Sequence, residues 1–274
     1  EMTNMASISA KDVMNLRNQT GLAMMECKKA LIEAEGDIER AEVLLRKKLK
    51  GKMEGKSDRV AGEGRIEVAV SDDGTNAALV NMKAETDFTA KNDNFITASQ
   101  QIAQLALAAE AGIVDITTEM SEIIDNLRIT TGENISIGRI EKFNGEAGKT
   151  VYGTYVHHDG KTGSLIQLEG NVSEEVRRQL AMHITAAMPR PLGISPDDIP
   201  AELVEKERKF RLEQAMESGK PEQIAEKMVE GGMRKFYSEV ALLEQPFVME
   251  PSQKISDLIG DASVSVFRRW QVGE

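Results

Sequence analysis

One pattern in the chain limits the fold more than any other: an alternating strand, a turn with glycine, a second strand, a loop and a helix. In its first occurrence, apolar residues alternate over 66–70, and Asp72-Asp73-Gly74 makes the turn. A strand returns over 78–82, and a helix is expected over 93–111. Alternation with a period of two is typical of a hairpin that buries one face.

The same pattern recurs in the second half of the chain. Residues 151–157 alternate, Asp159-Gly160 makes the turn, and a strand returns over 164–168. A helix is expected over 173–188, with Ser173 as its N-cap. The repeat predicts an α+β core of two related subdomains with antiparallel sheets.

Helical sequences precede this core. Ser9 and Asp12 form a capping-box pattern, and Gly21 is expected to end the first helix. A second helix is expected over 23–34, and Asp37 is a good N-cap for a third. The sequence therefore predicts an N-terminal three-helix module, followed by a basic, glycine-containing linker over 50–64 that we expect to be flexible or partly frayed helix.

A helical hairpin is expected after the second repeat. Its helices are predicted over 201–217 and 221–230, and Gly231-Gly232 is expected to interrupt the second one before a new helix over 233–243. The apolar residues expected on the facing sides of the hairpin are Leu203, Phe210, Met216, Ile224 and Met228.

The charge of the chain excludes some classes of partner. The formal net charge is −11 and the isoelectric point is about 5.0, whereas a general nucleic-acid binder needs a basic face. The single cysteine allows no intramolecular disulfide, no apolar run reaches the roughly 18 residues of a membrane-spanning helix, and residues 1–10 do not resemble a secretion signal. We expect a cytoplasmic protein that binds neither nucleic acid nor membrane.

The sequence contains no assembled active site. It has neither a glycine-rich phosphate-binding loop nor histidines and cysteines at metal-ligand spacing. His157 and His158 are adjacent, so on a strand they would point to opposite faces. Cys27 is expected to pack inside a helical face, and His183 to lie in the core or face a partner. We expect no metal, no cofactor and no enzymatic chemistry.

Two features are typical of a contact surface. Met24-Met25 opens the second helix, where both side chains are either core fillers or an adaptable apolar contact. Phe88 lies in a polar loop, whereas Phe95 is the expected buried aromatic of the next helix. Phe88 is either tucked back onto the core or presented to a partner, with Asp87 beside it. Pattern alone leaves both alternatives open in each case.

A series of short motifs runs in order along nearly the whole chain. From the N-terminal end they are Leu16-Arg17, Thr20-Gly21, Met24-Met25-Glu26-Cys27-Lys28-Lys29-Ala30-Leu31, Thr86-Asp87-Phe88 with Ala90-Lys91-Asn92, Gly132-Glu133-Asn134-Ile135, Met182-His183-Ile184, Ser218-Gly219-Lys220-Pro221, Ile224-Ala225-Glu226-Lys227-Met228-Val229-Glu230-Gly231, Leu243-Glu244-Gln245-Pro246 and Val272-Gly273-Glu274. The series resembles bacterial elongation factor Ts, whose N-terminal module is similar in fold to ubiquitin-associated (UBA) domains.

The resemblance implies a guanine nucleotide exchange factor that acts on elongation factor Tu, GDP-bound and nucleotide-free, in translation elongation. It implies that the Asp87-Phe88 loop inserts between helices of the GTPase domain and dislodges Mg²⁺ from GDP. It places His157 near the phosphate-binding loop of the partner. The residues implied to contact the partner are Arg17, Met24, Met25 and Lys28 in the N-terminal module, Thr86, Asp87, Phe88 and Thr89 in the loop, and Gly132 and His157 in the core.

The resemblance also divides the chain and marks its departures. The expected segments are a UBA-like module over 5–55 with its linker to about 64, a first core subdomain over 65–145, a second over 146–192 and 232–274, and an inserted hairpin over 193–231. The hairpin matches the dimerisation region of the family, although the sequence does not decide between monomer and dimer.

Three departures from the family stand out. Thr89 stands where the family usually has valine, and we expect it to alter packing beside the loop. Gly232 stands where the family usually has arginine and is expected to loosen a helix junction, and we expect the C-terminal helix of some members to be absent after Glu274. The rival hypothesis is a UBA-type binding module on an α+β scaffold without exchange activity, and an enzyme is a more distant third.

Overall fold

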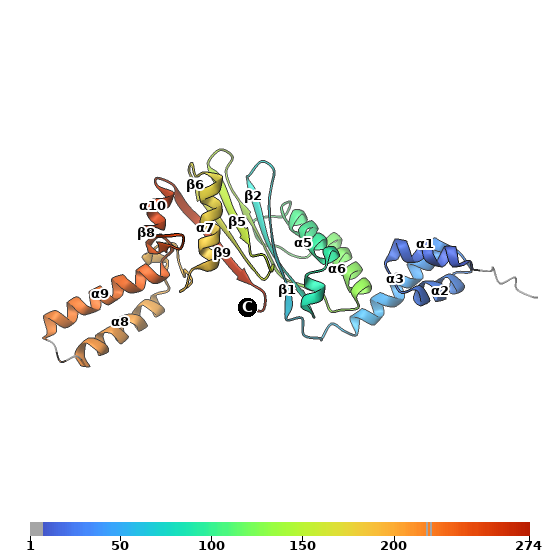
Figure 1. Ribbon diagram of the computed structural model, residues 1–274, viewed down its shortest axis with the longest axis horizontal. Coiled ribbons are helices and arrows are strands. Elements are labelled where there is room, and N and C mark those ends of the chain that lie inside the picture. The colour runs from blue at the N-terminus through green and yellow to red at the C-terminus, as the bar shows by residue number, and fades with distance from the viewer. Residues whose placement is uncertain (1–7, 218, 220) are drawn as a thin grey trace, which may run out of the picture. The chain divides into compact units, whose positions relative to one another are not determined.

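The computed structural model describes residues 8–217, 219 and 221–274, and its helices and strands confirm the predicted α+β class (Figure 1). The α-helices are α1 (Ala10–Thr20), α2 (Met24–Glu33), α3 (Ile38–Glu54), α4 (Asp87–Ala90), α5 (Asp93–Ala106), α6 (Thr118–Thr131), α7 (Glu174–Ala186), α8 (Ala201–Glu217), α9 (Glu222–Val240) and α10 (Ile255–Ile259). The strands are β1 (Glu63–Val70), β2 (Asn76–Ala84), β3 (Gly112–Ile113), β4 (Ser136–Asn144), β5 (Thr150–Val156), β6 (Thr162–Glu169), β7 (Pro246–Phe247), β8 (Glu250–Lys254) and β9 (Ser263–Gln271). Short 3-10 turns lie at Pro196–Asp198 and Leu242–Glu244.

The chain divides into two compact units. The first contains the described residues up to Glu67, together with Val80–Glu141 and Val272–Glu274. The second contains Val68–Leu79 and Lys142–Gln271.

The first N-terminal helix begins and ends at the predicted caps, and the second and third begin within one residue of the predicted positions. Ser9 and Asp12 form the expected capping box, since the Ser9 hydroxyl accepts from the Asp12 N–H at 3.1 Å and the Asp12 carboxylate accepts from the Ser9 N–H at 3.2 Å. Gly21 ends α1 with a φ of 70°, and Asp37 caps α3. The buried residues of this bundle are Val13, Leu16, Leu22, Cys27, Ala30, Leu31, Ala34, Ala41 and Leu45. Residues 5–7 of the predicted module lie outside the described residues.

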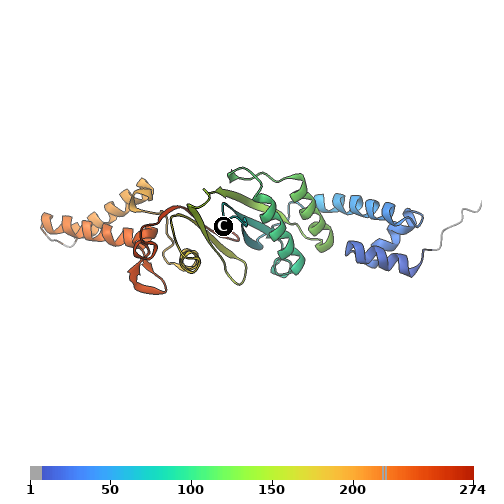
Figure 2. The same ribbon diagram turned by 90° about the horizontal axis from the view of Figure 1, so that it is seen from above.

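The expected linker is more ordered than its composition suggested. Helix α3 continues to Glu54, so the beginning of the predicted linker is helical. Helix α3 packs against α6, and Lys50 of α3 forms an ion pair of 2.7 Å with Asp125. Figure 2 shows α6 beside its other neighbour, α5.

Both predicted hairpins are present in the sheets. The first hairpin lies in a sheet of strand order β1-β2-β4-β3, and the second lies in a sheet of order β5-β6-β9; strands β7 and β8 pair separately. In the first hairpin the turn is held by Asp73, whose carboxylate accepts from Ser71 and Thr75; these hydrogen bonds lower the pKa of Asp73 to about 2. Strands β5 and β6 pair antiparallel over their whole length.

The core of the second unit lies between α7 and its sheet. Helix α7 packs on β5 and β6. It approaches closely because residue 153 is glycine: a Cβ there would lie 2.2 Å from the Arg177 carbonyl oxygen. The fully buried members of this core include Ile166, Leu180 and Ile184.

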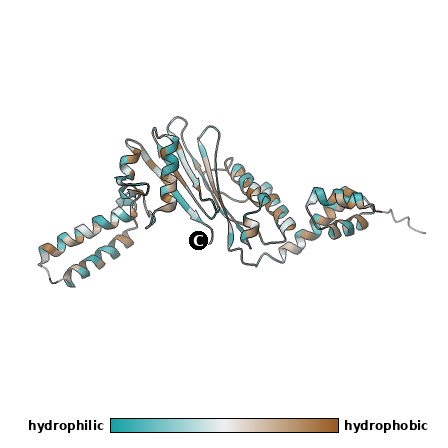
Figure 3. Ribbon diagram, viewed as in Figure 1, coloured by the Kyte–Doolittle hydropathy of each residue, from teal (hydrophilic) through white to brown (hydrophobic). Residues whose placement is uncertain are grey.

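The helical hairpin is formed by α8 and α9, but its facing sides differ from those expected. The contact between the helices is made by Ala215, Ala225, Val229 and Met233. The five residues expected there are between 37% and 68% exposed instead, namely Leu203, Phe210, Met216, Ile224 and Met228. Ala225, Val229 and Met233 recur every four residues along α9 and form its buried stripe, so Ile224 and Met228, each one position earlier, lie beside this stripe. Figure 3 accordingly shows hydrophobic residues scattered along α8 and α9 among hydrophilic ones. Residues 218 and 220 of the predicted connection lie outside the described residues.

The expected break at Gly231-Gly232 is wrong, because α9 is continuous from Glu222 to Val240. A glycine inside a helix costs only about 1 kcal/mol relative to alanine, and burial of Val229 and Met233 on either side of the pair outweighs it. Gly232 also admits a close neighbour, since a Cβ there would lie 2.9 Å from Cδ of Arg211.

Candidate partner-binding site

The loop between β2 and α5 carries the one-turn helix α4. Thr86 is the N-cap of α4: its backbone is extended, and its hydroxyl oxygen accepts from the Thr89 N–H at 3.3 Å. Asn92 caps the following helix by accepting from the Asn94 N–H at 2.9 Å. Ala90 is buried. Helix α4 is thus capped at its start by Thr86, followed directly by the capped start of α5, and a small residue of α4 is packed in the interior.

Phe88 projects from this short helix. Its side chain is 83% exposed, whereas Phe95 is fully buried as predicted. The alternative that Phe88 is tucked back onto the core is therefore wrong. Burying a phenylalanine stabilises by roughly 1.5–3 kcal/mol, and this chain forgoes that gain within its own fold.

Asp87 and Lys91 form an ion pair along the same turn. The Lys91 ammonium donates to the Asp87 carboxylate at 2.7 Å, and the two side chains are 61% and 40% exposed, respectively. Exposed pairs of this spacing contribute only about 0.3–0.5 kcal/mol. The ion pair with Lys91 by itself therefore holds the Asp87 carboxylate only weakly. Thr89 is half-buried beside it.

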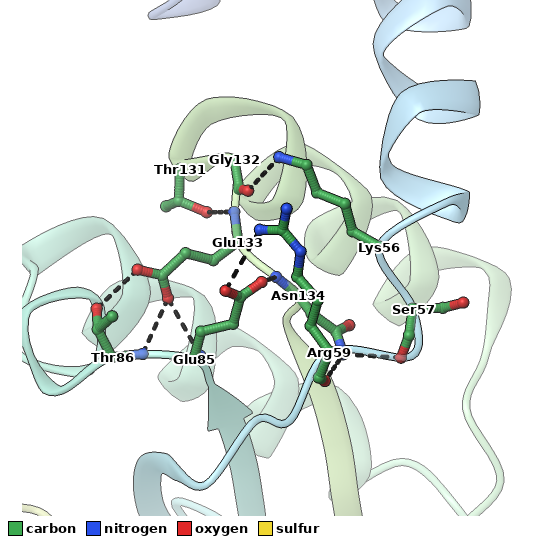
Figure 4. A network of polar contacts seen from close by, with 9 residues as sticks. All are labelled: Lys56, Ser57, Arg59, Glu85, Thr86, Thr131, Gly132, Glu133 and Asn134. Atoms are coloured by element: carbon green, nitrogen blue, oxygen red, sulfur yellow. Dashed lines mark hydrogen bonds and ion pairs between the residues drawn. The ribbon is translucent and has the colours of Figure 1, made fainter.

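A polar network anchors the start of α4 to the end of α6 (Figure 4). The Glu133 carboxylate accepts hydrogen bonds from the N–H of Glu85 at 3.1 Å, the N–H of Thr86 at 3.2 Å and the hydroxyl of Thr86 at 2.7 Å. In return, the Glu85 carboxylate accepts from the Asn134 N–H at 2.7 Å. Two segments about fifty residues apart in sequence are thereby joined in both directions.

The same network holds the linker that follows α3. The Asn134 side-chain amide donates to the carbonyls of Ser57 at 2.9 Å and Arg59 at 2.7 Å. Arg59 also lies 3.6 Å from the Glu85 carboxylate, as Figure 4 shows. The expectation of a flexible linker is therefore wrong over 57–59, because a buried asparagine fixes its backbone.

The N-terminal module exposes the second group of predicted contact residues. Met24 is 46% and Met25 62% exposed, so the alternative that they are core fillers is wrong. Their helix has no side-chain N-cap, since Ala23 occupies that position. Arg17 on α1 and Lys28 on α2 are exposed as well.

Gly132 and His157 lie on different units. Gly132 ends α6 with a φ of 73°, and its carbonyl accepts from the Lys56 ammonium at 2.8 Å. His157 belongs to the turn after β5 and not to the strand, so the expectation that His157 and His158 point to opposite faces is wrong. The turn brings their ring centroids within 4.3 Å, and the Tyr155 hydroxyl lies 3.3 Å from Nδ1 of His157.

The remaining candidate groups for chemistry are packed in the interior. Cys27 is buried, as predicted. His183 is buried, and its Nε2 lies 2.9 Å from Oε1 of Gln245 while its Nδ1 accepts from the Val248 N–H at 3.3 Å. This arrangement suits a neutral ring, and burial lowers the pKa of His183 despite the opposing effect of Gln245. Within the described residues, no group of three or more histidine, cysteine, aspartate or glutamate side chains is placed to hold a metal ion.

Comparison with known proteins decides the family. A family model described as Elongation factor TS matches residues 85–274. The chain belongs to the elongation factor Ts family. Similar proteins, each named Elongation factor Ts, include those of Halorhodospira halophila (41% identical), Alkalilimnicola ehrlichii (42%) and Yersinia pestis (42%). In each case the similarity covers 98% of this chain and 93% of the relative.

Membership of this family confirms the predicted functional class, a nucleotide exchange factor. Elongation factor Ts is a nucleotide exchange factor of translation elongation, and it acts by binding elongation factor Tu rather than by covalent chemistry. Within the described part of the chain, no helix is both long and apolar enough to cross a membrane.

Two residues of the chain contribute to the loop although the sequence assigned them no role at the site, namely Lys91 and Glu133. Lys91 lies four positions after Asp87, a spacing that places the two side chains on one helical face and could have indicated the ion pair. Glu133 gave a weaker signal, an acidic residue directly after the glycine that ends α6. Its contacts with Glu85 and Thr86 depend on tertiary structure.

Proposed function

We propose that this protein speeds GDP release by inserting the Asp87-Phe88 loop into the GTPase domain of elongation factor Tu and dislodging Mg²⁺. The observation that carries the proposal is the 83% exposure of Phe88 on a short helix whose start is capped by Thr86 and anchored by Glu133. A presented, fixed aromatic is the typical anchor of an interface. Because α4 is already ordered, little conformational entropy is lost when the partner closes around Phe88.

The effect on GDP follows from electrostatics. The Mg²⁺ ion that bridges the phosphates is among the largest local charges in a GTPase site. Displacing the residues that hold it removes much of the anchoring of the nucleotide. Phe88 need not touch GDP, since it has only to stabilise a shifted arrangement of the partner's helices. Asp87, beside it, meets a positive or hydrogen-bonding group.

The N-terminal module, predicted over 5–55, serves as a second foothold in this proposal. Exposed Met24 and Met25 offer an adaptable apolar contact, and exposed Arg17 and Lys28 flank it with positive charge. Gly132 and His157 are proposed as further contacts from the core. The module supplies affinity, and the loop supplies the change in nucleotide binding.

The coupling must act in both directions. If binding of this protein to elongation factor Tu weakens the affinity for GDP by some ratio, bound GDP weakens the affinity of elongation factor Tu for this protein by the same ratio. A complex of factor, elongation factor Tu and GDP is therefore transient, and GTP completes the cycle by mass action.

Stopped-flow release of a fluorescent GDP analogue from elongation factor Tu tests the proposal. Phe88→Ala is expected to slow stimulated release about 30-fold, the equivalent of about 2 kcal/mol for an anchor residue. Asp87→Ala is expected to slow it less. If Phe88→Ala matches the wild-type protein, the insertion mechanism is wrong. If the wild-type protein binds elongation factor Tu but does not speed release, the rival hypothesis of a simple binding module is correct.

We further propose that the hairpin of α8 and α9 supports a homodimer. Phe210 and Met216 are 53% and 68% exposed on its outer side, and a second copy would cover such side chains. Light scattering over a concentration series measures this, with Phe210→Ser expected to weaken self-association. A constant monomer mass at all concentrations would contradict the proposal.

A further inference from the structure

Helix α4 is too short to hold its own direction. It has four residues, and even helices of about 12 residues are marginal in isolation. The direction in which Phe88 points must therefore be set by the groups that contact the ends of α4. One of these groups, the Glu133 carboxylate, comes from a different part of the chain.

Glu133 contacts the start of α4 through both of its carboxylate oxygens. Oε2 accepts from the N–H groups of Glu85 and Thr86, and Oε1 accepts from the Thr86 hydroxyl. Hydrogen bonds to a charged acceptor are roughly twice as strong as neutral ones. A negative charge is also favourable at a helix N-terminus, where N–H groups lack partners within the helix.

The Thr86 hydroxyl passes this anchoring into the helix. Its proton is donated to Glu133, and its oxygen accepts from the Thr89 N–H. The order of contact is thus Glu133, then Thr86, then the turn that carries Phe88. The half-buried position of Glu133 keeps water from replacing these bonds easily.

The geometry points to Glu133 as a positioning residue for nucleotide exchange. It fixes the direction of Phe88 through Thr86, and its role does not require contact with elongation factor Tu. This inference rests on the proposed role of Phe88. It adds that exchange activity depends on a carboxylate at the end of α6, outside the loop that meets the partner.

The first test needs no partner. In hydrogen–deuterium exchange of the full chain, Glu133→Ala should speed exchange of the peptide over 85–92 at least about tenfold, because its amides lose their acceptor. A peptide over 95–106 should keep its wild-type rate. Uniformly faster exchange across the first unit, or no change over 85–92, would overturn the inference.

The second test is stopped-flow GDP release. Glu133→Ala should slow stimulated release about tenfold, which corresponds to the loss of about 1.4 kcal/mol. The release rate with Glu133→Gln should lie between those of Glu133→Ala and the wild-type protein, since an amide offers one acceptor oxygen instead of two. Glu122→Gln and Glu122→Ala, at an exposed glutamate of α6, the helix that precedes Glu133, are the control variants and should leave the rate unchanged.

A third variant pair guards against a folding defect at position 133. Thr86→Val removes the hydroxyl that joins Glu133 to α4 and should slow release, whereas Thr86→Ser retains the hydroxyl and should restore at least half of the wild-type rate. If Thr86→Val and Thr86→Ser behave alike, the inferred route through the hydroxyl is wrong.

A double-mutant cycle separates this inference from the proposed function. In the Phe88→Ala background, Glu133→Ala should slow release by less than about twofold, because Glu133 is inferred to act on exchange through the Phe88 side chain, which is already missing. A full additional tenfold loss would overturn the inference and leave the role of Phe88 intact. If Phe88→Ala alone has no effect on release, the proposed function fails, and the hydrogen-exchange experiment still decides whether Glu133 positions α4.

Discussion

The two strand–turn–strand–helix copies differ most in the loop before the helix. Residues 85–92 join β2 to α5, whereas only residues 170–173 join β6 to α7. The longer loop contains α4 and exposes Phe88 by 83%, while the shorter one turns Val172 into the core, where it is 8% exposed. Similar scaffolds thus place a loop apolar residue in opposite environments, and the additional residues of the first loop form the proposed contact surface.

The largest expected effect separates the two phenylalanines of the first copy. Phe95→Ala should lower the free energy of unfolding by about 3–5 kcal/mol, because Phe95 is fully buried. Phe88→Ala should change it by less than about 0.5 kcal/mol, as for other exposed positions. Urea unfolding measures both, and a large loss in Phe88→Ala would mean that Phe88 packs in the fold after all.

The corresponding position of the second copy should behave in the opposite way to Phe88. Val172→Ala removes buried methyl groups and should cost about 1–2 kcal/mol of stability. It should leave stimulated GDP release within about twofold of wild type under conditions where the protein is folded. A strong loss of exchange activity with unchanged stability would make this loop a contact surface too.

A pH dependence near neutral pH is expected from the helix of the second copy. The buried polar residue of α5 is Ser99, whereas that of α7 is His183, whose pKa is lowered by burial. Because the pKa of His183 is lower in the folded than in the unfolded state, where it is about 6.5, the neutral ring favours the folded state. This contribution to the free energy of unfolding is fully present above about pH 6.5 and is lost as the pH falls below that value. The free energy of unfolding should therefore decrease between about pH 7 and pH 5, as measured by urea titration. His183→Gln should flatten this slope, and an equal slope in both proteins would contradict the prediction.

The smallest expected effect concerns the ion pair on α4. Lys91→Ala frees the Asp87 carboxylate from a contact of 2.7 Å between exposed groups. Stability should fall by no more than about 0.5 kcal/mol, and GDP release should change by less than about twofold. Exchange that is tenfold slower would show that Lys91 itself contacts the partner.

Local rules predicted much of this fold. Ser9, Asp37 and Ser173 cap the helices that the sequence assigned to them, because capping depends on neighbouring residues. The continuity of α9 through Gly231-Gly232 could not be predicted in this way, since it depends on packing against α8. The same holds for the candidate site: the sequence indicated the Asp87-Phe88 loop, but whether Phe88 was buried or presented remained open.

The contribution of Glu133 also lay beyond local rules. Its three acceptor contacts reach a segment 47 and 48 positions away along the chain, and only the folded structure brings them together. The sequence indicates the residues that are proposed to contact the partner more readily than those that hold them in place.

The proposed mechanism requires that the exposed Phe88 of the first loop produces exchange and that the buried Val172 of the second loop does not. Its most direct test is stopped-flow GDP release from elongation factor Tu with wild-type, Phe88→Ala and Val172→Ala proteins at equal folded concentration. We expect release about 30-fold slower for Phe88→Ala and within about twofold of wild type for Val172→Ala. Equal rates for Phe88→Ala and wild type would contradict the account.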